Sequence, residues 1–479
     1  MKGKEDPIAN YTWQVDFQLF DSLFHSTPNK MKKLAKQSTM LVRPTIYWNL
    51  ILVFLGFAFF TACYPELQTA PVRKNMTWEQ GENLKDSPEI MLKWSQQIEN
   101  SYTFPQNVGF PPPIIARWFS IYFVAMHDAL NSVDPRYATY ASLSQDKKAD
   151  PNATMIQAVY EVLKAFNAPK MTSIDSLYTA TMGEIKDGEK KDRGISLGKT
   201  VAQELLAKRA PDNPYLVLAG FNPTPSTGTT PGEYRHLPGP GYALAGYHLQ
   251  QPWVMSSGDQ FRPGPPYPVN SPEYTADYNE VKLLGDINND TGDQRYIGIF
   301  WAENSNRGWN KITRLVLNNN KKYYNAWEVA RLFALVHMAI ADSYISVFEA
   351  KMHYYYWRPI SAIRLGASDG NDDTEGDPNW TPAMGTPPIG EYPSAHAIAG
   401  SAAAGVLINF FRRSDIPFVM DSGYLPGTRS FNTIDEAVRE NSLSRIYIGY
   451  HFRKAVDVGE EKGYEIGNYV FGNALKPVK

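Results

Sequence analysis

Apolar residues recur along most of the chain at helical spacing, and loops rich in proline and glycine separate the apolar segments. Alternating strand patterns are scarce. The pattern therefore predicts a mainly α protein, built as two packed four-helix-type bundles with long Pro/Gly-rich loops. The predicted helices occupy residues 111–133, 155–167, 173–206, 326–358, 397–413 and 434–457.

Two of the predicted helices resemble each other. The segment ARWFSIYFVAMHDALNSV (116–133) aligns without a gap on ARLFALVHMAIADSYISV (330–347). The match favours two bundles descended from one unit, although two alanine-rich amphipathic helices could also converge on such a pattern. The identical pairs include Arg117 with Arg331 and Asp128 with Asp342.

The pattern divides the chain into three parts. Residues 1–63 are predicted to be an N-terminal extension that ends in a signal, lipoprotein or anchor segment. Residues 64–103 are polar and weakly patterned, which predicts a tether and an outer helix. Residues 104–479 are predicted to form the helical domain, with its site in about 326–470. The Pro/Gly/Thr-rich stretch 210–272 is predicted to pack across this domain like a lid.

The first part has the features of an export signal. The basic stretch MKKLAKQSTMLVR precedes the almost wholly apolar IYWNLILVFLGFAFFTAC, which ends at Cys63. The ending FTAC resembles a bacterial lipoprotein signal, with Met31 as the expected start; the alternative is a single membrane anchor. Both predict export, as a periplasmic or outer-membrane lipoprotein of a Gram-negative-type bacterium, with membrane contact only through the N-terminal lipid or anchor.

The composition bears on the class of partner and on cysteine chemistry. Lys plus Arg number 47 and Asp plus Glu 49, so no global charge points to nucleic acid, and any anion site must come from local clustering. Cys63 is the only cysteine, which excludes an intrachain disulfide and a cysteine-based metal site.

The first local cluster lies in KMHYYYWRP. Lys351 and Arg358 are seven positions apart, which on a helix is two turns, so both cations are expected on one side. A bound anion would offset the repulsion between them. The alternative is that both side chains extend to solvent from a surface face.

The second cluster is PSAH, directly before an alanine-rich helix. The first turn of that helix has free backbone N–H groups, to which Ser394 adds a hydroxyl. His396 lies in the same turn, where it could exchange protons with a bound ligand. The alternative is a plain serine N-cap.

The third cluster is SRIYIGYH. Arg445 and His451 are six positions apart, and Gly449 between them predicts a bend that could bring both onto one ligand. The alternative is a structural histidine. Taken together, the three clusters suit a tetrahedral or trigonal-bipyramidal oxyanion, because arginine forks and a lysine neutralise its oxygens.

The order and spacing of the clusters resemble those of the vanadium-dependent haloperoxidases and the related type 2 phosphatidic-acid-phosphatase superfamily. Their shared pattern is Lys-x6-Arg-Pro, then Pro-Ser-Gly-His, then Ser-Arg-x5-His, and this chain has KMHYYYWRP, PSAH and SRIYIGYH. Surrounding segments such as GNDDTEGDPNWTPAMGTPPIGEYPSAH look like the chloroperoxidase-like bacterial branch, over about residues 104–469.

The resemblance implies a vanadate cofactor and the oxidation of halide by hydrogen peroxide to hypohalous acid, which halogenates a small organic acceptor. It implies His396 as the distal acid–base, His451 as the vanadium ligand, and Lys351 as the group that polarises the peroxide. Vanadate would be bound by Lys351, Arg358, Ser394, the backbone N–H of Ala395, Arg445 and His451. The alternative is a phosphatase of the same superfamily, in which His451 forms a phosphohistidine and His396 protonates the leaving group.

The chain departs from the family pattern at two positions. Ala395 stands where the family has glycine, so a methyl group must fit there. The phosphatases carry an aspartate four residues after the axial histidine, whereas Asp457 follows His451 by six. The sequence leaves open which group orients His451.

Overall fold

The computed structural model describes residues 86–102, 110–141, 144–212, 225–238, 242–319 and 324–478. The predicted signal or anchor segment, Cys63 and most of the predicted tether lie outside these described residues. Export and lipidation therefore stay predictions.

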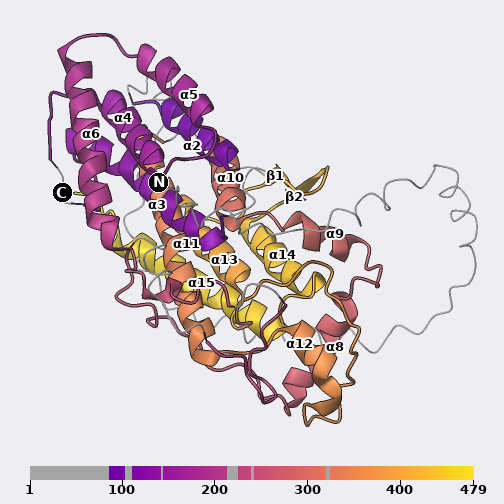
Figure 1. Cartoon of the computed structure of the whole chain (residues 1–479). Helices are drawn as coiled ribbons and strands as arrows, with labels where there is room; N and C mark the ends of the chain where they lie inside the picture. Colours follow the sequence, from indigo (N-terminus) through magenta and orange to yellow (C-terminus); the bar gives the residue numbers. More distant parts are fainter. Residues whose placement is uncertain are drawn as a thin grey trace, which may run out of the picture. The chain divides into compact units, whose positions relative to one another are not determined.

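Helices dominate the described residues, which confirms the mainly α prediction (Figure 1). The two short strands pair antiparallel, with Phe418 opposite Phe431. The elements are α2 (Glu89–Ser101), α3 (Pro112–Val133), α4 (Pro151–Ala165), α5 (Met171–Gly183), α6 (Glu189–Arg209), η3 (Ala210–Asp212), η4 (Tyr247–Leu249), α8 (Pro272–Leu284), α9 (Asp293–Phe300), α10 (Ser305–Asn318), α11 (Ala326–Tyr354), α12 (Pro359–Leu365), η6 (Gly366–Ser368), α13 (Ala395–Phe411), β1 (Phe418–Asp421), β2 (Thr428–Phe431), α14 (Ile434–Tyr447) and α15 (Arg453–Asn473).

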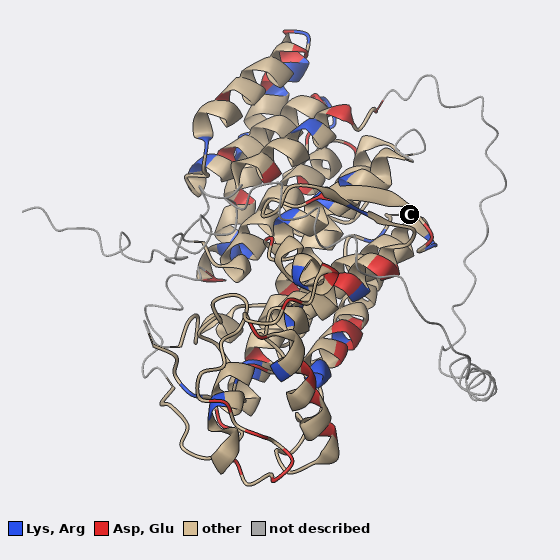
Figure 2. Cartoon of the chain, turned by 90° about the vertical axis from the view of Figure 1, so that its right-hand side faces the viewer, with Lys and Arg blue, Asp and Glu red and all other residues tan. Residues whose placement is uncertain are grey.

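The helices pack as two groups. Helices α3 to α6 form one bundle, and α11, α13, α14 and α15 form the other, with α3 packed against α11 between them (Figure 1). Within the described residues α11 alone is long and apolar enough to cross a membrane, but 94% of its most apolar window is buried inside the protein. It is therefore the core helix of the second bundle. Acidic and basic residues are interspersed along the ribbon (Figure 2).

The aligned arginines of α3 and α11 make equivalent contacts. Arg117 Nη2 donates to the carbonyl oxygen of Arg209 at 2.7 Å, where α6 ends. Arg331 Nε donates to the carbonyl oxygen of Leu475 at 2.7 Å, just after α15 ends. Each arginine therefore ties the central helix of its bundle to the end of the last helix, which supports the predicted repeat.

The aligned aspartates are also equivalent. Asp128 accepts backbone N–H groups from Tyr140 and Ala141, each at 3.0 Å. Asp342 accepts backbone N–H groups of the loop that follows η4, at 2.6 to 3.0 Å. Both buried carboxylates thus cap a loop that crosses their bundle.

Three predicted helices end earlier or break. The segment 173–206 is two helices, separated near Gly188, whose φ is 141°. The segment 434–457 is also two helices, separated at Gly449, whose φ is 78°. Helix α11 ends at Tyr354 because Tyr355 adopts a left-handed conformation with φ of 46°.

The argument that Lys351 and Arg358 share one helix face is therefore wrong. Lys351 lies in the last turn of α11, whereas Arg358 is the N-cap residue of α12. The left-handed residue Tyr355 ends α11 between them.

Three glycines of α15 bring its backbone against α13. A Cβ added at Gly459 would lie 2.9 Å from the carbonyl oxygen of Ser394. One at Gly463 would overlap the Ile398 carbonyl and the Ser401 hydroxyl. Gly467 meets the α13 backbone in the same way, one turn further along. This close approach places the start of α13 beside the segment that carries His451.

Replacing Gly463 with alanine is expected to lower the free energy of unfolding by about 1–3 kcal/mol, because a methyl group must push two helices apart. The matched control is Gly472→Ala on the same helix, where nothing lies within 4 Å of the added Cβ. Urea denaturation of both variants measures the effect. Equal stability of the two variants would contradict this account of the helix contact.

His337 of α11 gives the fold a pH dependence. Its ring stacks on Phe123 at 4.5 Å, and burial lowers its pKa to about 3. In the unfolded chain the same histidine has a pKa of about 6.5. Between the folded and the unfolded pKa the unfolded state binds more protons, so the free energy of unfolding falls as the pH falls. Between pH 6 and pH 5 the wild type is expected to lose about 1.2 kcal/mol more than a His337→Gln variant. Denaturant unfolding at the two pH values measures the difference, and parallel pH profiles would contradict it.

Candidate active site

Three cations of the second bundle are buried without a carboxylate partner. Lys351 is 0% exposed, Arg358 1% and Arg445 5%. Among the described residues none of the three forms an ion pair; their hydrogen bonds go to backbone oxygens, a hydroxyl and an imidazole. A buried uncompensated charge is costly, so this arrangement favours a bound anion.

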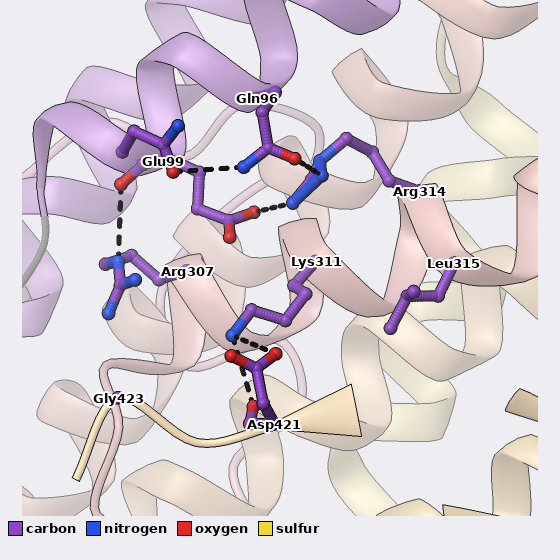
Figure 3. A pocket seen from close by; sticks show the side chains of 9 residues that line it. Gln96, Glu99, Arg307, Lys311, Arg314, Leu315, Asp421 and Gly423 are labelled. Atoms are coloured by element: carbon purple, nitrogen blue, oxygen red, sulfur yellow. Dashed lines mark hydrogen bonds and ion pairs between the residues drawn. The ribbon is translucent and has the colours of Figure 1, made fainter. Parts of the chain in front are cut away.

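A cavity elsewhere on the chain shows the contrast. It has a volume of about 420 Å³ and is lined by three cations of α10 (Figure 3). Each of these cations has an acidic partner, so the charges neutralise one another and call for no ligand. The pairs are Arg307 with Glu303 at 2.6 Å, Lys311 with Asp421 at 3.2 Å, and Arg314 with Glu99.

Lys351 holds the segment that leads into α13. Its Nζ donates to the carbonyl oxygens of Gly390, Glu391 and Pro393 at 2.8, 2.7 and 2.6 Å. These bonds use all three hydrogens of the ammonium group. Burial and then the charge of Arg358 lower the pKa of Lys351, while Glu391 opposes them. The structure therefore shows Lys351 ordering the segment before α13.

Arg358 and His451 are in direct contact. Arg358 Nη1 lies 3.0 Å from His451 Nε2 and also donates to the carbonyl oxygen of Tyr450 at 3.0 Å. A guanidinium group only donates, so Nε2 of His451 must accept and Nδ1 must carry the proton. His451 is thus a neutral imidazole, which is the form that binds a metal, and its Nε2 lone pair accepts from Arg358 in this structure.

Glu391 orients His451, which answers the question that the sequence left open. The Nδ1–H of His451 donates to Glu391 Oε1 at 2.9 Å, and the backbone N–H of Phe452 donates to the same oxygen at 3.0 Å. Asp457 is exposed on α15 and pairs with Arg439 at 2.7 Å, away from this contact. Burial raises the pKa of Glu391 to about 8, against the charges of Lys351 and Arg358.

Burial and residues from all three sequence clusters lower the pKa of His451. Burial lowers this pKa most, followed by the charges of Arg358, Lys351 and Arg445, and by His396. Since such effects fall with distance, the three sequence clusters converge around this imidazole.

Ser394 begins α13 as predicted. Its side chain accepts the N–H of Ala397 at 3.4 Å, and its own N–H donates to the carbonyl oxygen of Ala455 at 2.9 Å. Among the described residues the N–H groups of Ala395 and His396 have no hydrogen-bond acceptor, as expected in a first helical turn. Ala395 is helical with negative φ, so alanine replaces glycine here without backbone strain.

His396 is held from a different helix. Its Nδ1 lies 2.9 Å from the Oγ of Ser305, the first residue of α10. Burial and the charge of Arg445 keep the pKa of His396 well below its usual value, while the backbone carbonyl of Trp301 opposes them. His396 is therefore a neutral imidazole at neutral pH and can accept a proton.

Arg445 is surrounded by tyrosines. Its Nε donates to Ser444 Oγ at 2.9 Å and its Nη2 to the carbonyl oxygen of Gly298 at 3.2 Å. Burial lowers its pKa to about 10, and Tyr450, Tyr424 and Tyr344 oppose that shift. The guanidinium group stays charged at neutral pH.

The described part of the Pro/Gly-rich stretch packs on the site. The Tyr234 N–H donates to the carbonyl oxygen of Tyr355 at 2.8 Å, and the Tyr242 hydroxyl accepts the Gly390 N–H at 3.0 Å. Both tyrosines are buried. This stretch therefore braces the turn after α11 and the segment before α13.

The comparisons with known proteins point to one family. Residues 331–479 match the family model of the VCPO second helical-bundle domain. The vanadium chloroperoxidase of Curvularia inaequalis is 25% identical to this chain in an alignment 490 residues long. The alignment covers 77% of this chain and 80% of that protein.

Two solved bacterial structures share the fold. The first bacterial vanadium-dependent iodoperoxidase matches with a TM-score of 0.70 at 21% identity, over 83% of this chain and 99% of its own. A holo-type bacterial vanadium-dependent chloroperoxidase matches with a TM-score of 0.64 at 16% identity, over 82% of this chain and 98% of its own.

Proposed function

We propose that the chain is a vanadium haloperoxidase, a vanadate-dependent enzyme that oxidises halide with hydrogen peroxide to hypohalous acid. The observation that carries the proposal is the set of three buried cations without a carboxylate partner, beside an imidazole that presents a lone pair.

The charge of the cluster fits such an oxyanion. Lys351, Arg358 and Arg445 supply three positive charges, and an ionised Glu391 would leave a net charge of +2. A dianionic oxyanion would neutralise that excess. Arginine forks and the free N–H groups of α13 suit its oxygens, and His451 Nε2 suits its central atom.

Vanadate, when bound, would act as a Lewis acid that activates hydrogen peroxide toward attack by halide. The protein residues have separate tasks. Arg358, Arg445, Ser394 and the Ala395 N–H bind oxygens, and Lys351 holds the segment in front of α13. His396 is neutral and would accept and return the proton of the incoming peroxide. The small organic acceptor reacts with the product.

A pair of assays tests the function. Purified protein, reconstituted with vanadate, is expected to oxidise bromide or iodide with hydrogen peroxide, and bromide oxidation can be followed with monochlorodimedone. Equilibrium dialysis measures vanadate binding. Hydrolysis of p-nitrophenyl phosphate by the vanadate-free protein, without halide oxidation by the reconstituted one, would replace the proposal with the phosphatase reaction.

Replacing Glu391 with glutamine is expected to weaken vanadate binding by about 10- to 100-fold, because the partner of a metal-ligating histidine fixes its ring and raises its basicity. The amide keeps the shape of the carboxyl group and cannot ionise. Glu375→Gln, at an exposed carboxylate with side-chain exposure of 91%, is the control. Equal dissociation constants for both variants in equilibrium dialysis would show that Glu391 has no such role.

A further inference from the structure

His396 is joined to a buried serine that the sequence clusters do not include. Ser305 Oγ lies 2.9 Å from His396 Nδ1 and comes from α10, 91 positions away in the chain. Ser305 is only 3% exposed. It is not needed to cap its helix, because the N-cap residue is Asn304, whose side chain accepts the Asn306 N–H at 3.0 Å.

A second hydroxyl group extends this contact. Tyr344 of α11 is 3% exposed, and its hydroxyl is hydrogen-bonded to Ser305. Burial raises the pKa of Tyr344 to about 12, and the hydrogen bond with Ser305 and the charge of Arg445 oppose the shift. Tyr344 therefore stays protonated, and its hydroxyl lies beside Arg445 at the edge of the site.

The hydroxyl of Ser305 restrains the ring of His396 in either tautomer. A serine hydroxyl has one hydrogen to donate and can accept as well, so Ser305 can bond to Tyr344 and to His396 Nδ1 at the same time. The 2.9 Å contact therefore fixes the orientation of the imidazole from α10. A base oriented by a third group in this way recurs in enzymes that activate a nucleophile.

We propose that Ser305 and Tyr344 are positioning residues that fix the orientation of the His396 ring, so that His396 can exchange a proton at the site. This proposal rests on the proposed function, since it concerns the acid–base group of the same site. It adds two residues, from α10 and α11, that lie outside the three sequence clusters.

The first test reads the tautomer in vanadate-free protein, and so does not depend on turnover. In ¹⁵N-histidine NMR of the full chain, the resonances lost in His396→Ala identify His396. Ser305→Ala is expected to shift the ring-nitrogen resonances of His396 and its tautomer balance. An unchanged His396 spectrum in Ser305→Ala overturns the proposal.

The second test separates positioning from stability in the reconstituted enzyme. Ser305→Ala is expected to lower kcat by about 10- to 100-fold with unchanged vanadate affinity, and Ser305→Thr to restore it. Tyr344→Phe is expected to lower kcat less. Ser343→Ala, which removes a buried hydroxyl bonded to the Ile340 carbonyl, is the control. Equal losses in Ser305→Ala and Ser343→Ala overturn the proposal. A wild type without vanadate binding or halide oxidation instead refutes the proposed function, while the tautomer still decides the role of Ser305.

Discussion

Replacing His451 with alanine is expected to remove vanadate binding and halide oxidation together. Outer partners of a metal-ligating histidine are worth about 10- to 100-fold in affinity, so loss of the ligand itself should exceed about 100-fold. No other described histidine of the cluster has its two ring nitrogens held in this way. Nε2 of His451 accepts from Arg358, and its Nδ1–H donates to Glu391 at 2.9 Å. The substitution also leaves Glu391 and Arg358 without their shared partner.

Equilibrium dialysis and the bromide assay measure both quantities for His451→Ala. His353→Ala is the matched control, because His353 is an exposed histidine of α11, two residues after Lys351. Circular dichroism checks that both variants are folded. Retained vanadate affinity in His451→Ala would show that the oxyanion is held by the cations alone and would remove His451 from the ligand set.

The bundles could be predicted because their signal is local. The helical periodicity that α3 and α11 both show depends only on nearby positions, and the core of each bundle follows from it. The bend predicted at Gly449 is present, with a φ of 78°, although the helix was expected to continue to residue 457. The break near Gly188 needed backbone conformation as well, since glycine inside a helical pattern does not by itself mark a turn.

Lys351 and Arg358 show the limit of helix reasoning at the site. Their seven-residue spacing matched the family motif, yet a left-handed residue, Tyr355, separates them, and they converge through a turn. The resemblance named these two residues, and the structure buries both of them near Glu391, whereas the geometric reason given for them was wrong. Tyrosine carries no local signal for a left-handed conformation.

Glu391 and Ser305 could not be read from the sequence, because their partners lie 60 and 91 positions away. Glu391 does immediately precede the Tyr-Pro-Ser segment, and an acid next to a predicted anion site is an anomaly that could have drawn attention to it. Ser305 follows an ordinary asparagine cap and offers no such signal.

His396→Ala is expected to have the opposite signature from His451→Ala. Vanadate affinity should be retained, because His396 lies outside the ligand set, whereas kcat should fall by about 10²- to 10⁴-fold with loss of the acid–base group. Steady-state kinetics of the reconstituted variant, with dialysis at the same pH, measure the two effects separately. A parallel loss of affinity would show that His396 binds the oxyanion directly.

The same variant provides a background for a double-mutant cycle. If Ser305 acts through His396, then Ser305→Ala should lower kcat in the wild type and have no further effect in His396→Ala. Additive losses would instead mean that Ser305 affects the site by another route, such as the packing of α10. The cycle is well suited to this pair, because the 2.9 Å contact between Ser305 and His396 joins two helices and each substitution removes one side of it.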